Sequence, residues 1–141
     1  MKNHQISKIR EHANQLLQQF GIQSAPVNVE GIAGSLGIVI RRTPTDDEVS
    51  GFLFKQQTGP TVIGVNSLHH PNRQRFTIAH ELGHFMLHDF SEVHVDQAVM
   101  RLRSSASSTG IDSDEVEANR FAAELLMPEA FLQEEIERLG V

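Results

Sequence analysis

Residues 76–88 read FTIAHELGHFMLH. It places His80, Glu81, His84 and His88 in a run whose other residues are almost all apolar. A helix that is apolar nearly all round is expected at the centre of a domain. Imidazoles and carboxylates buried there cost several kcal/mol unless they have partners. The stretch therefore predicts a buried helix whose polar side chains bind one another or a cation.

The segment from His80 to His84 matches the pattern H-E-x-x-H. On an α-helix, positions i and i+4 differ by about 40° around the axis, so both imidazoles can reach one metal ion. Glu81 lies about 100° from His80, close enough to touch water at that ion. Zinc makes such water acidic, and a nearby carboxylate can take the proton as a general base. The pattern predicts a hydrolytic zinc centre; the alternative is a histidine–glutamate cluster that satisfies itself in the core.

Two histidines leave a zinc ion short of protein ligands, and a helix expected over about 113–127 can supply a third. Its apolar residues fall within an arc of about 140° that also contains Glu115. They are Ala118, Phe121, Ala122, Leu125 and Leu126. Glu117, Arg120 and Glu124 fall on the opposite side, where we expect solvent. Glu115 is therefore the predicted third ligand; the alternative is an exposed carboxylate that interacts with the helix dipole.

Two further residues are candidates for the surroundings of the metal. Asn119 lies one turn after Glu115 and could accept a hydrogen bond from the distal nitrogen of His80, which would fix the tautomer of that ligand. It could equally be a surface amide. His88 lies one turn beyond His84; a place at the rim or behind a ligand is favoured over direct metal binding.

The composition of the 141-residue chain excludes several classes of protein. Hydrophobic residues make up 39% and charged residues 21%, which are ordinary values for a folded domain. The formal net charge of −6 argues against direct nucleic-acid binding. Without cysteine, a disulfide or thiolate metal site is excluded. No stretch resembles a signal peptide or the roughly 20 apolar residues of a membrane span, so we expect a cytoplasmic protein without membrane contacts.

The periodicity of apolar residues predicts the order of the remaining elements. Helices are expected over about 5–20, 28–36, 72–88, 113–127 and 128–139; strands are expected over 37–42, 50–56 and 60–66, with a candidate short strand at 93–95. The second and third strands lie close enough to form a hairpin, and the Ser- and Gly-rich segment 103–114 is expected to be a mobile loop. This order predicts one α+β domain over residues 1–141, with a small twisted sheet of about three strands packed on the central helix.

RFTIAHELGHFMLH (75–88) together with EVEANRFAAELLMP (115–128) resembles the ImmA/IrrE-type metallopeptidases. The resemblance spans about residues 28–132 and implies a compact gluzincin-like, zincin-type fold. It implies one Zn²⁺ per chain, held by His80, His84 and Glu115, with Glu81 as the general base. Members of the family act in the bacterial cytoplasm, and several cleave helix-turn-helix repressors of mobile elements or stress regulons. The resemblance therefore implies a protein substrate of that kind.

Zinc proteases of this shape usually hold an extended substrate along a sheet edge above the catalytic helix. We expect that edge to be SGFLFKQ (50–56), where Gly51 would admit the substrate backbone next to Phe52; an ordinary core strand is the alternative. The competing function is a non-proteolytic, zinc-binding regulatory or toxin-like module. Glu81 favours the enzyme, because a purely structural zinc site needs no base and is usually closed by four protein ligands.

Overall fold

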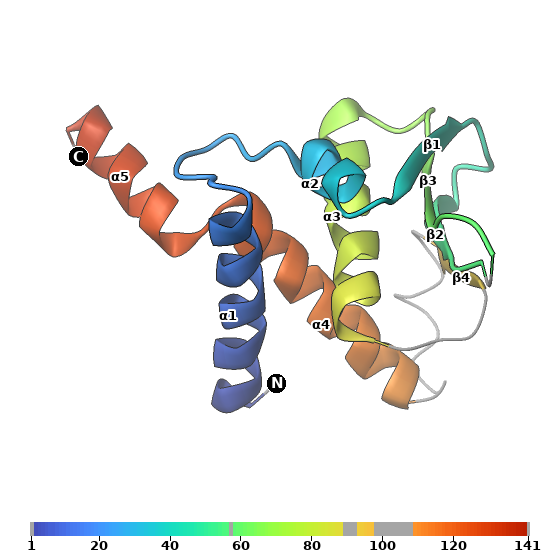
Figure 1. Cartoon of the computed structure of the whole chain (residues 1–141), viewed down its shortest axis with the longest axis horizontal. Coiled ribbons are helices and arrows are strands. Elements are labelled where there is room, and N and C mark those ends of the chain that lie inside the picture. The colour runs from blue at the N-terminus through green and yellow to red at the C-terminus, as the bar shows by residue number, and fades with distance from the viewer. Residues whose placement is uncertain (1, 57, 89–92, 98–108, 141) are drawn as a thin grey trace.

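The computed structural model describes residues 2–56, 58–88, 93–97 and 109–140. The helices are α1 (Asn3–Gln19), α2 (Val29–Ser35), α3 (Pro71–Leu87), α4 (Thr109–Leu126) and α5 (Glu129–Leu139). The strands are β1 (Val39–Thr43), β2 (Val49–Phe54), β3 (Val62–Asn66) and β4 (Val93–Gln97). Figure 1 shows the sheet on one side of α3 and α1 on the other, with α4 crossing α3 near its C-terminal end. The predicted α+β fold is confirmed, and no helix in the described ranges is long and apolar enough to cross a membrane.

The sheet has the strand order β1-β3-β2-β4. β1 pairs with β3 in parallel, whereas β2 is antiparallel to both of its neighbours. The predicted hairpin of the second and third strands is therefore confirmed. The fourth strand is the segment that the sequence marked only as a candidate at 93–95, which adds one strand to the three expected.

The prediction that residues 50–56 form an edge of the sheet is wrong. β2 lies between β3 and β4, and β4 pairs Asp96 with Gly51 and Val95 with Phe52. The edges of the described sheet are β1 and β4. The alternation of apolar residues shows which face of a strand is buried, but it carries no information on a neighbour that comes some 40 residues later in the chain.

Gly51 brings the sheet close to α3 rather than to a substrate. A Cβ atom at this position would lie 2.5 Å from the carbonyl oxygen of Gly64 on β3 and 2.6 Å from Cγ2 of Thr77 on α3. Neither distance is tolerable for a carbon atom. The absence of a side chain at residue 51 is therefore what lets α3 approach the middle of the sheet.

α3 is the central helix of the structure, as predicted. His70 caps its first turn by accepting a hydrogen bond from the backbone N–H of Asn72, and Pro71 occupies the first helical position, where no N–H is needed. Ile78, Ala79 and Leu82 are at most 1% exposed. On α4, the apolar arc predicted from the sequence is buried: Ala118, Phe121, Ala122 and Leu125 are all 0% exposed. The core therefore lies on both sides of α3.

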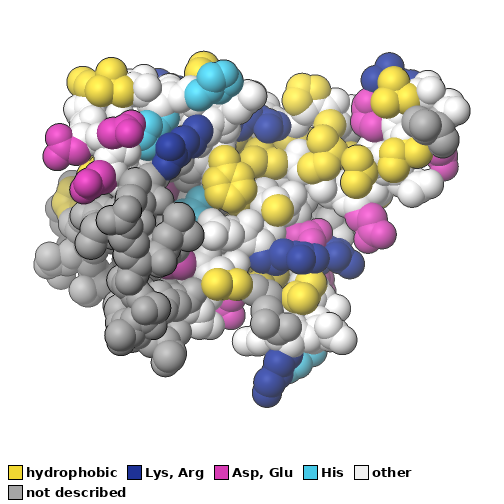
Figure 2. Space-filling view, turned by 180° about the vertical axis from the view of Figure 1, so that it is seen from behind, with side chains coloured by type: hydrophobic (Ala, Val, Ile, Leu, Met, Phe, Trp, Pro, Cys, Tyr) yellow, Lys and Arg dark blue, Asp and Glu magenta, His cyan; other side chains and the backbone are white. Residues whose placement is uncertain are grey.

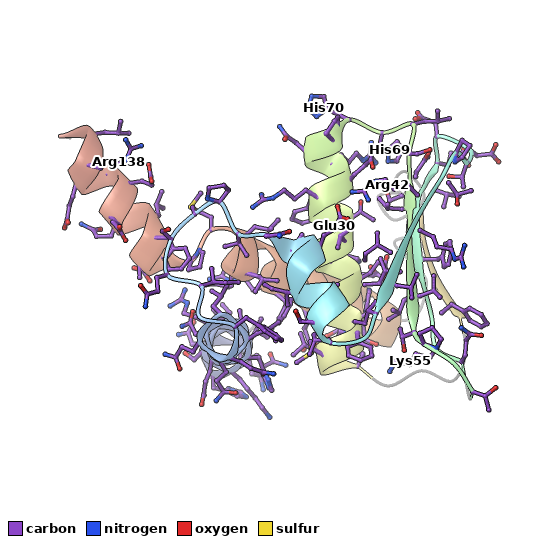
Figure 3. All side chains as sticks on the ribbon, turned by 45° about the horizontal axis from the view of Figure 1, so that its top comes forward. Glu30, Arg42, Lys55, His69, His70 and Arg138 are labelled. Atoms are coloured by element: carbon purple, nitrogen blue, oxygen red, sulfur yellow. The ribbon has the colours of Figure 1, made fainter. Side chains whose placement is uncertain are left out.

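Two groups of hydrogen bonds connect the outer helices α2 and α1 to the rest of the structure. Arg42 on β1 donates hydrogen bonds to both carboxylate oxygens of Glu30 on α2, which lowers the pKa of Glu30, and to Gln74 on α3 (Figure 3). Glu124 on α4 is 8% exposed and accepts hydrogen bonds from Arg10 on α1, at 3.0 Å, and from Arg120, at 2.9 Å. The prediction that Glu124 is solvated is wrong, because α1 packs on that side of α4.

The start of α4 also differs from the sequence prediction. The helix begins at Thr109, so residues 109–114 are helical and do not belong to a loop. Residues 103–108 of the predicted mobile loop lie outside the described residues. At the other end of the chain, α5 begins at Glu129 after Pro128, close to the predicted position. It projects from the body (Figure 1) and has no buried residue. Leu132 and Leu139 are exposed large apolar residues of this helix. Figure 2 shows apolar side chains on the projecting part of the molecule.

Gly51→Ala should lower the free energy of unfolding by about 1–3 kcal/mol, because the new methyl group overpacks the contact between α3 and the sheet. Gly34→Ala is the matched control, since a Cβ atom there meets nothing within 4 Å and its helical site favours Ala. That variant should be neutral or up to about 1 kcal/mol more stable. Urea denaturation of both variants measures the difference, and equal effects would contradict the packing role of Gly51.

Candidate metal centre

Three donor atoms from two helices converge at the interface of α3 and α4. Glu115 Oε1 lies 2.9 Å from His80 Nε2 and 3.3 Å from His84 Nε2, and the two Nε2 atoms are 3.2 Å apart. His80 is 4% exposed, His84 is 1% exposed and Glu115 is 5% exposed. The structure thus brings together the three residues that the sequence pattern selected as ligands.

Close approach of the two helices makes this convergence geometrically possible. A Cβ atom at Gly83 would lie 3.1 Å from Cδ1 of Phe121 and 3.2 Å from the carbonyl oxygen of Ala118, both on α4. Gly83 lies between His80 and His84 on α3 and has no side chain. α4 therefore crosses α3 next to this glycine. Glu115 lies one turn before Ala118, which places its carboxylate beside the histidines. This role of Gly83 was not predicted from the sequence, although a glycine inside an apolar helix signals close packing.

Asn119 fixes the direction of the His80 lone pair. Its Oδ1 atom lies 2.7 Å from His80 Nδ1. An amide oxygen can only accept, so Nδ1 carries the hydrogen and donates it. In the neutral ring, Nε2 is then unprotonated, and its lone pair points towards Glu115 and His84. This is the hydrogen bond that the sequence analysis considered for Asn119.

The donor set fits a zinc-type ion. Bonds of about 2.0–2.1 Å in a tetrahedral arrangement separate neighbouring ligand atoms by about 3.3 Å. The three separations here are 2.9, 3.2 and 3.3 Å. Two imidazole nitrogens and one carboxylate are also a common ligand set for catalytic zinc.

Glu81 is fully buried on the same helix. It follows His80 directly and is 0% exposed. Its side chain therefore lies inside the protein and not on the outer surface.

His88 lies behind His84, outside the group of three. Its Nδ1 atom is 3.0 Å from His84 Nδ1, and its Nε2 atom is 2.7 Å from Oε1 of Glu117. The prediction that Glu117 is solvated is therefore wrong: its side chain is 22% exposed and contacts His88. A helical wheel for α4 cannot show this contact, because His88 ends α3 and turns towards the flank of α4.

The other residues that the sequence singled out, Gly51 and Phe52, lie in the sheet. Figure 3 shows two further histidines, His69 and His70, at the start of α3, where His69 Nε2 is 3.1 Å from the carbonyl oxygen of Asp47 and His70 caps the helix. Phe52 covers Gly64 on β3, since a Cβ atom at Gly64 would lie 1.9 Å from the Phe52 ring. Gly51 and Phe52 therefore serve the packing of the sheet in this structure.

Comparison with known proteins identifies the family of this chain. The sequence model of the IrrE N-terminal-like domain, peptidase family M78, matches residues 33–140. The radiation response metalloprotease IrrE of Deinococcus radiodurans is 40% identical over 83 residues, which cover 56% of this chain and 23% of that protein. The uncharacterized immunity region protein 2 of Bacillus phage phi105 is 37% identical over 82 residues, or 58% of this chain and 47% of that protein. The chain thus spans about a quarter of one relative and about half of the other. With the family match covering most of its length, the chain belongs to the IrrE N-terminal-like peptidase family.

Proposed function

We propose that this chain is a zinc-dependent endopeptidase that holds one Zn²⁺ with His80, His84 and Glu115. The observation that carries the proposal is the convergence of three buried donor atoms within 3.3 Å of one another. When bound, zinc supplies Lewis acidity, which polarises a peptide carbonyl and makes water a better nucleophile.

In this proposal Glu81 is the general base. Glu81 follows the proposed ligand His80 in the chain and is buried, and its carboxylate would accept the proton of the attacking water. It would later return that proton to the leaving amine, as one group can serve both steps. Asn119 keeps the hydrogen of His80 on Nδ1, so that Nε2 stays available to the metal.

A catalytic site is favoured over a closed structural zinc site. Structural zinc usually has four protein ligands, whereas catalytic zinc has three and one open position. Within the described residues, the buried donor group contains three members, and His88 contacts the outer nitrogen of His84 rather than joining them. This geometry disfavours the alternative function as a non-proteolytic, zinc-binding regulatory or toxin-like module.

We further propose that the substrate is a protein in the cytoplasm, namely a helix-turn-helix repressor or antitoxin-like regulator of a prophage or stress response. The names of two relatives support this class, since one is a radiation response metalloprotease and the other comes from a phage immunity region. The net charge of −6 fits a protein that acts on the regulator and does not bind the nucleic acid itself.

Purified protein should contain about one zinc ion per chain, and removal of the ion should lower the melting temperature. A ligand that binds only the native state at about 100 times its Kd stabilises that state by about 2.7 kcal/mol. Elemental analysis gives the stoichiometry, and thermal denaturation with and without a chelator gives the shift. Protein that takes up no transition metal after incubation with zinc would exclude the proposed centre.

Glu81→Gln should retain zinc but lose at least about 100-fold in cleavage rate, because only the base is removed. The assay is incubation with the repressor encoded next to this gene, followed by gel analysis, with a chelator as the control. If the variant cleaves at the rate of the unmodified protein, Glu81 is not the base.

Glu115→Ala should weaken zinc binding by at least about tenfold, because loss of a direct ligand costs no less than loss of a supporting hydrogen bond. Glu134→Ala on α5 is the control, since it removes the same charge from an exposed position. Competition with a chromogenic chelator measures both affinities. Equal affinities for the two variants would remove Glu115 from the ligand set.

A further inference from the structure

We infer that Glu117 and His88 position His84 by determining which of its ring nitrogens carries the hydrogen. The inference rests on the proposed metal centre and concerns residues outside the group of three ligands. The contacts form a short chain: Glu117 Oε1 is 2.7 Å from His88 Nε2, and His88 Nδ1 is 3.0 Å from His84 Nδ1. We call Glu117, His88 and His84 the histidine relay.

Hydrogen-bonding chemistry gives the relay a direction. A carboxylate only accepts, so His88 Nε2 carries a hydrogen and donates it to Glu117. In the neutral His88 ring, Nδ1 is then an acceptor. The hydrogen between the two imidazoles therefore belongs to His84 Nδ1, which leaves His84 Nε2 unprotonated and directed at Glu115.

His88 has the same role for His84 as Asn119 has for His80: each accepts the hydrogen on Nδ1 of the ligand. Each histidine donates its Nδ1 hydrogen to an acceptor outside the donor group, so both Nε2 lone pairs face the same point. For His80 the acceptor is an amide. For His84 it is an imidazole whose own tautomer is held by a carboxylate, and carboxylates form the stronger, charge-assisted hydrogen bonds.

The backbone explains why His88 can take this position. His88 is the residue that follows α3; its backbone is extended, and its N–H still donates to the carbonyl oxygen of His84 at 3.0 Å. The side chain thus returns alongside His84 and is only 8% exposed. Glu117 comes from α4, two residues after Glu115, so one helix supplies both a ligand and the end of the relay.

A hydrogen bond explains the contact between His88 and Glu117 better than a second bound cation does. His88, Asp114 and Glu117 also offer donor atoms within 4.8 Å of one another. However, the distance of 2.7 Å between His88 Nε2 and Glu117 Oε1 is that of a charge-assisted hydrogen bond, and this contact needs no cation. Asp114 is more distant, at 3.4 Å, and its side chain is 51% exposed.

The test compares zinc affinities in two matched pairs of variants of the full chain. His88→Phe keeps an aromatic ring of similar size but removes the acceptor, whereas His88→Gln offers an amide oxygen in its place. Glu117→Ala and Asp114→Ala each remove one carboxylate that faces the same imidazole. Competition with a chromogenic chelator gives each affinity, and the melting temperature of the metal-free protein reports general damage to the fold.

We expect His88→Phe to lose at least about tenfold in zinc affinity, and His88→Gln to stay within about threefold of the unmodified protein. Glu117→Ala should lose more affinity than Asp114→Ala. Nitrogen-15 NMR of the zinc-loaded, unmodified protein should show the His88 hydrogen on Nε2. This last measurement needs no variant and is unaffected by any loss of folding.

Three results would overturn the relay: equal zinc affinity in His88→Phe and the unmodified protein, a His88 hydrogen on Nδ1, or two zinc ions bound per chain. These outcomes are distinct from failure of the proposed function. If the unmodified protein binds no zinc, both proposals fall. If it binds one zinc and cleaves its substrate while His88→Phe binds zinc equally well, only the relay is wrong.

Discussion

The contact between α3 and α4 is the constraint on which the rest of the structure depends. It combines an apolar interface, with Phe121 and Leu82 fully buried, and a polar cluster at the point where the helices come closest. Gly83 sets that distance, since any side chain there would press against Phe121 and the backbone at Ala118. Because buried polar groups are costly unless matched, the two helices are held in the relative position at which Glu115 meets both histidines.

The sheet restricts the position of α3 from the side opposite the contact with α4. Thr77 on α3 and the backbone of β3 occupy the space next to Gly51, so α3 cannot move towards the sheet. Nor can α3 move towards α4, because its backbone at Gly83 already lies against Phe121 and the carbonyl oxygen of Ala118. Close packing on two opposite sides leaves a helix little freedom to shift or rotate. This is the kind of rigid support that a metal centre requires, since small displacements of its ligands change the coordination geometry.

Much of this arrangement could be predicted from the sequence, because it depends on periodicity within single helices. The spacing of His80 and His84 and the inward direction of Glu115 follow from about 100° per residue. The errors arose where the answer depends on a second element. A wheel for α4 places Glu117 and Glu124 opposite the apolar arc, but His88 and Arg10 reach those positions from other helices. In the same way, the pairing of β4 with β2 depends on chain geometry that local patterns do not contain.

The histidine relay also explains why another histidine, His88, follows the helix that carries the H-E-x-x-H pattern. A neutral imidazole has one donor and one acceptor nitrogen, so a histidine that offers Nε2 to a cation must dispose of a hydrogen on Nδ1. In a core lined by Ile78 and Leu125, each such hydrogen needs an acceptor supplied by the protein. His80 donates to Asn119 on α4, and His84 donates to His88, the residue that follows α3, which in turn donates to Glu117. A metal site built inside an apolar interface therefore requires a second layer of polar residues, and that layer ends where the side chains reach partial exposure, as Glu117 does.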